Sequence, residues 1–353
     1  MSYYGEQFHD EREEPLRETV YHAGNGFYSP YTEPLWKKER RKIRNAGNGL
    51  AAAMLGYIFI SALFSDLFFA FTDIIFPMID LRRVITGSEV LEWSFSVFAY
   101  FVSFAVPFTL YVLFTRMPLE VALPFKKSKL DLSVGGVLVG MGSTIIASYA
   151  YTVLSTNLEI VGIGISMPEY TSPETVPGMI VYVFSMAVAP AFIEEMAFRG
   201  IVMQSLRRFG DVFALVASSL IFGIFHLNLV QMPYAFIAGL CIGYFVMRTG
   251  SLWVGVAIHF FNNIVAVVYE FAEKYVAEET YLFANILYNA VIVILAVIAL
   301  LLILRKYRDM FRFEPAKDAL SYGKKTLYFV TSPLVILALA YAFAITVQYI
   351  HLL

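Results

Sequence analysis

The chain has 353 residues, of which 59% are hydrophobic and 15% are charged, and its mean hydropathy is +0.66. A soluble domain carries about 25% charged residues, so this composition excludes a water-exposed surface over most of the chain. The net charge of −2 predicts no nucleic-acid partner, and the single cysteine, Cys241, cannot form an internal disulfide.

Residues 1–45 are predicted to form a hydrophilic cytoplasmic tail. They mix Glu, Arg, Tyr, Pro and Gly without apolar periodicity, which is typical of a disordered segment. The tail contains no apolar stretch of the kind found in secretory signal peptides. Residues 46–353 are expected to form one transmembrane domain.

Apolar segments recur along the rest of the chain. A helix needs about 20 apolar residues to cross a hydrocarbon core of about 30 Å. The sequence therefore predicts an all-α, polytopic membrane bundle of about 8–9 transmembrane helices, in the plasma membrane if the source is a prokaryote. The nine expected spans are 49–71, 92–114, 132–154, 177–198, 211–228, 232–248, 252–272, 281–304 and 328–352.

The Lys and Arg residues of the loops predict the orientation of these spans. Six basic residues lie between Lys37 and Arg44, and basic residues follow the second, fourth, sixth and eighth spans. Residues 155–176 and 227–231 contain none, although Arg82 and Arg83 depart from the pattern. Because basic loops remain in the cytoplasm, we expect a cytoplasmic N-terminus.

Ionisable residues concentrate in one part of the predicted bundle, and each such residue inside a span is a functional-site hypothesis. Glu194 and Glu195 follow an unbroken apolar stretch. Glu195 and Arg199 stand at i and i+4 with the acid first, which is the favourable order for a helical ion pair. Glu194 has no local partner of this kind, so we interpret it as a general base.

Two further groups lie on the spans that follow. His226 is four residues after Phe222, and His259 and Asn263 share one helix face at i and i+4. If residues 209–210 form a turn, Glu194 and His226 are both roughly 22–24 Å from it at about 1.5 Å per residue. The two side chains would then face each other across a helical hairpin.

The motifs Glu-Glu-x-x-x-Arg, Phe-x-x-x-His and His-x-x-x-Asn occur in this order on successive predicted helices. Together they resemble the CAAX protease and bacteriocin-processing family of intramembrane peptidases, which includes the type II CAAX prenyl endopeptidases. The resemblance covers about residues 175–270, which we take as the catalytic core.

The resemblance implies a role for each residue. Glu194 and His226 would activate a water molecule, Glu195 would support that arrangement, and His259 and Asn263 would donate to the developing oxyanion. Two residues are expected to support the site: Arg199 and Phe222.

The sequence is compatible both with a zinc site and with a site that contains no metal. Glu194, His226 and His259 could hold a single zinc ion with an open position for water. The chain has no His-Glu-x-x-His motif, and the same residues also suit a metal-free glutamate peptidase.

The expected activity is hydrolysis of a membrane-associated peptide or protein, of CAAX type or a peptide in maturation, with the lipid bilayer as the other partner. Two other functions use the same residues. A proton-coupled transporter would use the Glu and His side chains as a proton relay. A non-catalytic membrane scaffold or immunity protein would need no hydrolysis.

Overall fold

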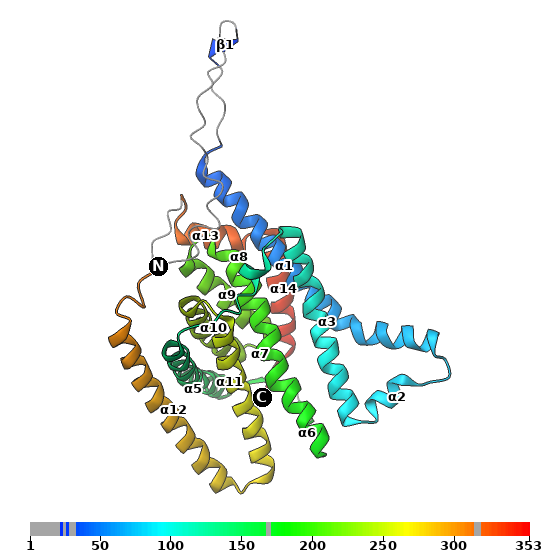
Figure 1. The fold of residues 1–353 in the computed structure, drawn as a ribbon. Helices are drawn as coiled ribbons and strands as arrows, with labels where there is room; N and C mark the ends of the chain where they lie inside the picture. The colour runs from blue at the N-terminus through cyan, green and yellow to red at the C-terminus, as the bar shows by residue number, and fades with distance from the viewer. Residues whose placement is uncertain (1–21, 24–25, 28–32, 167–170, 314–318) are drawn as a thin grey trace.

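The computed structural model describes residues 22–23, 26–27, 33–166, 171–313 and 319–353, and helices make up most of it (Figure 1). In this part of the chain, seven helices are long and apolar enough to cross a membrane. They are α1 (Leu35–Ile75), α3 (Glu89–Thr115), α5 (Leu130–Ile160), the continuous helix Val176–Arg207, α10 (Gln231–Thr249), α11 (Leu252–Tyr275) and α12 (Glu278–Lys306). The fold is therefore the predicted all-α polytopic bundle of an integral membrane protein.

Two of the nine expected spans differ from the prediction. The segment expected at 211–228 is α9 (Asp211–Phe225), whose 15 residues are too few for a full crossing. The segment expected at 328–352 is divided into α13 (Tyr322–Val330) and α14 (Pro333–Gln348), which meet at an angle of 72°. Counting this bent pair as one span gives up to eight spans among the described residues.

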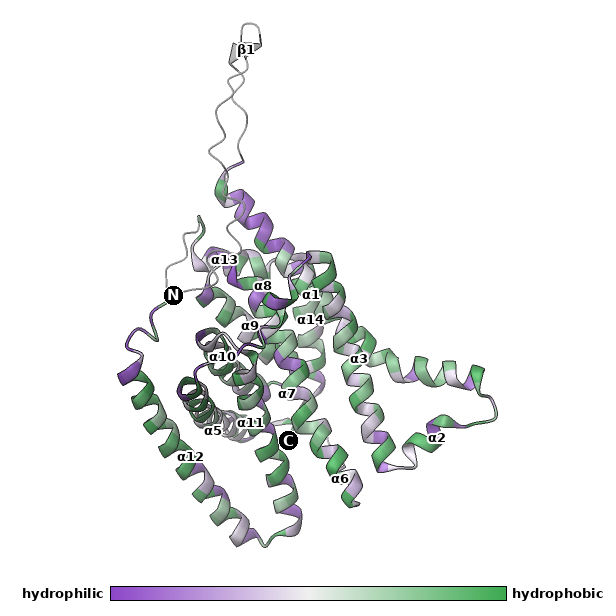
Figure 2. Ribbon diagram, viewed as in Figure 1, coloured by the Kyte–Doolittle hydropathy of each residue, from purple (hydrophilic) through white to green (hydrophobic). Residues whose placement is uncertain are grey.

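The basic run before the first span is helical. α1 begins at Leu35, so residues 37–44 form its first turns, and the expected end of the tail at residue 45 falls inside the helix. Figure 2 shows hydrophilic residues at this end of α1 and around α13, whereas α12 is hydrophobic over most of its length. Most of the predicted tail lies outside the described residues, apart from a short antiparallel pair, β1 (His22–Ala23) and β2 (Gly26–Phe27).

Short elements connect the long helices. α2 (Leu81–Thr86) lies between α1 and α3, and α4 (Leu119–Ala122) follows α3. β3 (Ile163–Ile165) pairs antiparallel with β4 (Ile350–Leu352), with Gly164 opposite His351. This pair joins the end of α5 to the C-terminal end of the chain.

Helix α5 packs against α10, α11 and α12, and glycines allow the close approach. A Cβ atom at Gly136 would lie 2.7 Å from the Phe245 ring, and one at Gly140 would lie 2.6 Å from Ile258. Small residues at helix contacts allow such packing in membranes, where burial against lipid adds little. The glycine face of α5 therefore positions α11, the helix that carries His259.

We expect Gly140→Leu to lower the free energy of unfolding by about 1–3 kcal/mol, because extra atoms in a well-packed contact force neighbours to shift. Thermal unfolding in detergent measures the effect. Gly323→Leu is the matched control, since nothing lies within 4 Å of a Cβ built there. Equal midpoints for the two variants would contradict this account of the contact.

Candidate active site

The helix from Val176 to Arg207 carries the glutamate pair, and it is not a regular α-helix. It contains α6 (Val176–Val183), η1 (Phe184–Val188), α7 (Ala189–Glu194), η2 (Glu195–Val202) and α8 (Met203–Arg207), where η1 and η2 are π-helical. Glu194 ends α7 and Glu195 begins η2. π-Helical turns inside α-helices occur frequently at functional sites.

Glu195 and Arg199 form the predicted ion pair, with 2.7 Å between Nη1 of Arg199 and Oε1 of Glu195. Both side chains are fully buried, at 0% and 1% exposure. The same Oε1 also accepts a hydrogen bond from Nδ1 of His259 at 3.0 Å. Because a carboxylate only accepts, Nδ1 of His259 carries the proton and its Nε2 points elsewhere.

Glu194 is the more accessible carboxylate, with 13% of its side chain exposed. Its Oε1 accepts a hydrogen bond of 2.5 Å from the hydroxyl of Tyr100 on α3. Its Oε2 lies 3.9 Å from Nε2 of His259, which is too long for a direct hydrogen bond. A separation of this size between two polar atoms suits a bridging water.

His226 lies directly after the last residue of α9, at the point where the chain leaves the helix. Its Nδ1 donates to the Phe222 carbonyl at 2.8 Å, so Nε2 keeps its lone pair in the neutral ring. The imidazole interacts electrostatically with both Glu194 and His259. The hairpin of η2–α8 and α9 therefore brings His226 and Glu194 together.

The Phe222 ring lies among the polar members of the site. It packs edge-on against the rings of His226 and His259, with centroids 4.9 and 5.9 Å away. The Arg199 guanidinium lies 4.1 Å from the centre of the same ring. The predicted supporting residue thus contacts three side chains of the site and excludes water from the ion pair.

Asn263 has a partner that the sequence analysis did not foresee. Its Nδ2 donates to the Met186 carbonyl in η1 at 3.2 Å. In a regular α-helix that carbonyl would accept from residue 190, which is Pro190 and has no N–H. The Asn263 amide therefore joins α11 to η1 at a carbonyl that has no α-helical N–H partner.

The turn after His226 lies between two helices of the bundle, at residues 227–230. Leu227 adopts a left-handed conformation at φ 53°. The buried side chain of Asn228 accepts from the N–H groups of Val230 and Gln231 and donates to the Ser166 carbonyl. Irregular backbone at membrane depth requires such internal partners, so Asn228 stabilises the turn that positions His226.

The zinc set considered in the sequence analysis is Glu194, His226 and His259. Among the described residues, no three His, Cys, Asp or Glu side chains are grouped so as to hold a metal ion. Both Nδ1 atoms donate to protein acceptors, so only the Nε2 atoms could act as ligands, and Nε2 of His259 is 3.9 Å from Oε2 of Glu194. A zinc ion at this site stays a prediction, which the metal dependence of the activity tests.

The motifs did not identify three residues that contact or support the candidate site: Tyr100, Asn228 and Gly255. Tyr100 lies on α3, outside the stretch that carries the motifs. Gly255 makes room for the ion pair, since a Cβ there would lie 2.8 Å from Oε2 of Glu195. A tyrosine or asparagine within an apolar segment is the signal that could have identified the first two.

Comparison with known proteins supports the assignment of this region. Residues 176–265 match the family described as "Type II CAAX prenyl endopeptidase Rce1-like". No curated protein and no solved structure matches the chain. The matched residues include Glu194, Glu195, His226, His259 and Asn263, the five predicted to be catalytic. Residues 176–265 of this membrane protein are thus similar to the type II CAAX prenyl endopeptidases, in agreement with the resemblance to the CAAX protease and bacteriocin-processing family.

Proposed function

We propose that this chain is an intramembrane endopeptidase that cleaves a membrane-associated peptide or protein with a water molecule activated by Glu194 and His226. The observation that carries the proposal is the grouping of Glu194, His226 and His259 beside the buried Glu195–Arg199 pair. Oε2 of Glu194 lies 3.9 Å from Nε2 of His259, and His226 interacts electrostatically with both residues. A water bound to Oε2 of Glu194 meets a carboxylate whose other oxygen is already oriented by Tyr100.

The proposed oxyanion donor is His259 in its imidazolium form. Two carboxylates and one guanidinium leave one negative charge, which an imidazolium at His259 neutralises. A neutral set is favoured in a low-dielectric interior, because an uncompensated buried charge is costly. With Nδ1 on Glu195, the protonated ring presents Nε2–H as a second donor.

Hydrolysis then follows from these positions. Glu194 accepts a proton from the water as its oxygen attacks the scissile carbonyl carbon, and Nε2 of His226 accepts the second hydrogen bond of that water. The carbonyl oxygen gains negative charge, which the Nε2–H of His259 stabilises. Glu194 then returns the proton to the leaving amine when the C–N bond breaks.

Asn263 completes the oxyanion site. Its amide nitrogen carries two hydrogens, and one of them is bonded to the Met186 carbonyl. The second hydrogen is the proposed donor to the oxyanion. The bond to Met186 fixes the amide orientation, so the same residue both joins two helices and presents a donor.

We expect Tyr100→Phe to reduce kcat/KM about tenfold, because a hydrogen bond to a charged group contributes about 1.5–3 kcal/mol and part of it persists through water. Steady-state cleavage of a peptide by purified protein gives the value. Tyr341→Phe on α14, which also removes one tyrosine hydroxyl, is the control. Unchanged kcat/KM in Tyr100→Phe would show that this hydroxyl does not orient the base.

The experiment for the function itself is cleavage of quenched fluorescent peptides, lipidated and plain, by the wild type and by His226→Gln in detergent. We expect hydrolysis by the wild type and a loss of about 10²-fold or more in the variant, since the imidazole takes part in the proton transfer. Parallel reactions with a chelator, followed by added zinc, measure metal dependence. A folded wild type that cuts none of the peptides would favour the transporter or the scaffold.

The proposal also gives the protein an orientation. A cytoplasmic N-terminus agrees with the basic residues that begin α1 and with Arg305 and Lys306, which end α12. In this orientation the hairpin turn at Phe209 and Gly210 faces the cytoplasm. A CAAX-type or maturing peptide would then approach from that side.

A further inference from the structure

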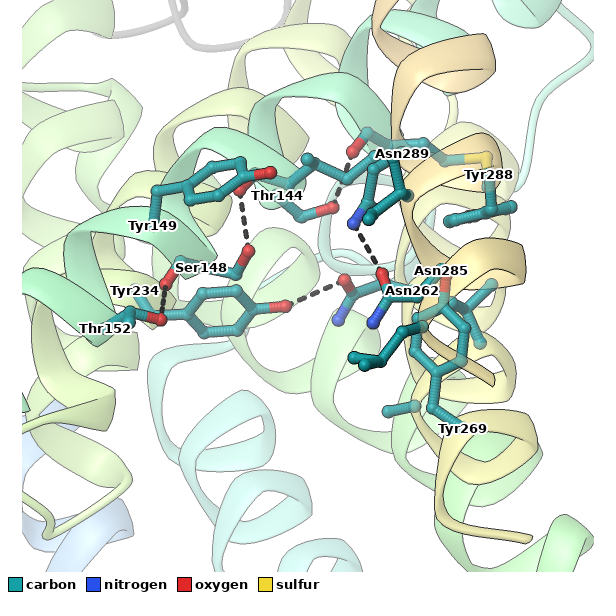
Figure 3. A pocket seen from close by; sticks show the side chains of 16 residues that line it. Thr144, Ser148, Tyr149, Thr152, Tyr234, Asn262, Tyr269, Asn285, Tyr288 and Asn289 are labelled. Carbon is teal, nitrogen blue, oxygen red and sulfur yellow. Dashed lines mark hydrogen bonds between the residues drawn. The ribbon is translucent and has the colours of Figure 1, made fainter. Parts of the chain in front are cut away.

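A cavity of about 460 Å³ lies beside the site, between α5, α10, α11 and α12 (Figure 3). Polar side chains from all four helices line it. The tyrosines and asparagines among them are Tyr149, Tyr234, Asn262, Tyr269, Asn285, Tyr288 and Asn289. None of the lining residues is charged. A volume of this size is typical of a ligand pocket.

Hydrogen bonds connect the cavity to the active site. Tyr234 donates to Oδ1 of Asn262 at 2.7 Å (Figure 3). Nδ2 of Asn262 in turn donates to Oδ1 of Asn263 at 3.3 Å. Asn262 also follows His259 by three residues on α11, so the two side chains are about one turn apart. The cavity therefore begins about one helical turn from the proposed oxyanion site.

Part of the polar lining is already satisfied within its own helix. The hydroxyls of Thr144, Ser148 and Thr152 on α5 donate to carbonyls one turn earlier. These residues give the cavity wall a polar surface but require no ligand.

Other polar groups that line the cavity can form further hydrogen bonds. The Tyr269 hydroxyl is buried and has no hydrogen-bond partner among the described residues. Asn289 donates to Oδ1 of Asn285 at 2.6 Å, which leaves Nδ2 of Asn285 as a donor and Oδ1 of Asn289 as an acceptor. Because these two residues are one turn apart on α12, the donor and the acceptor lie side by side.

These adjacent, uncharged donors and acceptors are complementary to the polar groups of a peptide backbone. Each residue of an extended peptide carries one N–H donor and one C=O acceptor. An intramembrane peptidase must cut an extended segment, whose backbone groups have lost their helical partners in a medium without water. Uncharged donors and acceptors near the site compensate for that loss, whereas charged groups would select charged ligands.

We propose that the cavity between α5, α10, α11 and α12 binds an uncharged, extended segment of the substrate next to the scissile bond. The inference rests on the proposed function, which it refines by assigning the place where the substrate backbone is held. Asn285 and Asn289 pair with its N–H and C=O groups, and Tyr269 donates to a further carbonyl.

The test compares two quenched peptides that share one scissile bond. The long peptide carries four additional uncharged residues on one side, and both orientations of the extension are made. One of the two long peptides carries its extension on the side that reaches the cavity. For this peptide we expect KM to rise about tenfold in Asn285→Leu and in Asn289→Leu, which corresponds to one lost hydrogen bond. The kcat value and the KM of the short peptide stay unchanged.

Asn157→Leu is the matched control. Asn157 lies on α5, and its Nδ2 bonds a carbonyl of its own helix at 2.6 Å. Equal KM values for the long peptide in all variants and the wild type would overturn the proposal and identify a cavity that holds only water.

A binding measurement separates this inference from the peptidase function. A long peptide with a photoreactive phenylalanine in its extension is cross-linked to wild type and to Asn285→Leu, and the labelled segment is mapped. Labelling within α5, α10, α11 or α12 that falls at least fivefold in Asn285→Leu supports the cavity even if no peptide is hydrolysed. Labelling confined to helices that do not line the cavity overturns it even if hydrolysis is observed.

Discussion

Glu194→Gln is expected to reduce kcat for peptide hydrolysis by about 10²–10⁴-fold, the range for removal of a positioned general base. The amide cannot accept the proton of the attacking water, yet its oxygen can still accept the bond from Tyr100. KM should change little, because the side chain keeps its size and its hydrogen bond. The measurement is steady-state cleavage of a quenched peptide, together with thermal unfolding to show that the variant is folded.

Glu273→Gln provides the control for this result. Glu273 lies on α11, as His259 does, but its side chain is exposed. The control should hydrolyse the peptide at the wild-type rate. If Glu194→Gln retained more than a tenth of the activity, the base would have to be another group, and the proposed mechanism would be wrong.

The second large effect concerns the buried ion pair. Arg199→Met is expected to lower the free energy of unfolding by about 3–5 kcal/mol, because removal of one partner leaves an uncompensated charge in the interior. The carboxylate of Glu195 would retain only the hydrogen bond from His259. Denaturant or thermal unfolding in detergent measures the loss.

Two further variants separate the charge from the packing. Arg207→Met removes another i, i+4 ion pair, which Arg207 forms with Asp211. Because the Asp211 side chain is 41% exposed, this variant should lower the free energy of unfolding by no more than about 1 kcal/mol. The double variant Glu195→Gln/Arg199→Met removes both charges and keeps an acceptor for His259. The double variant should recover at least half of the unfolding free energy that Arg199→Met loses. If it were as unstable as Arg199→Met, the loss would come from the packing of the Arg199 side chain on Phe222 and not from the buried charge.

Motif spacing predicts several contacts of the candidate site, because the separation of two residues along a helix determines the directions in which their side chains point. Glu195 and Arg199 at i and i+4 form the expected ion pair, and His226 approaches Glu194 after the turn at 209–210. Apolar run length likewise predicts the membrane class. These features depend on residues close in the chain or on neighbouring helices.

Other features depend on contacts that the local sequence does not specify. Tyr100 reaches Glu194 from 94 residues away, and no spacing rule connects the two. The bond of Asn263 to the Met186 carbonyl likewise exists only because α11 lies beside η1 in the folded protein. The π-helical turns also shift helix register, so adjacent glutamates could not be assigned to faces from a regular periodicity.

Two of the nine expected spans differ from the structure for another physical reason. Hydropathy measures how apolar a segment is but not where its helix ends. Residues 211–228 are mostly apolar, yet α9 ends at Phe225, before the left-handed Leu227 and the buried Asn228. The bend between α13 and α14 likewise interrupts an apolar stretch without changing its hydropathy.

The shortness of α9 has a consequence for the surrounding lipid. Its 15 residues extend about 22 Å, whereas the hydrocarbon core is about 30 Å thick. Val216 and Leu220 on this helix are exposed, so lipid meets it directly. Hydrophobic mismatch then requires the adjacent leaflet to thin by several Å or to admit headgroups and water. On the proposed function, such thinning beside α9 would make the energetics of substrate approach depend on acyl-chain length.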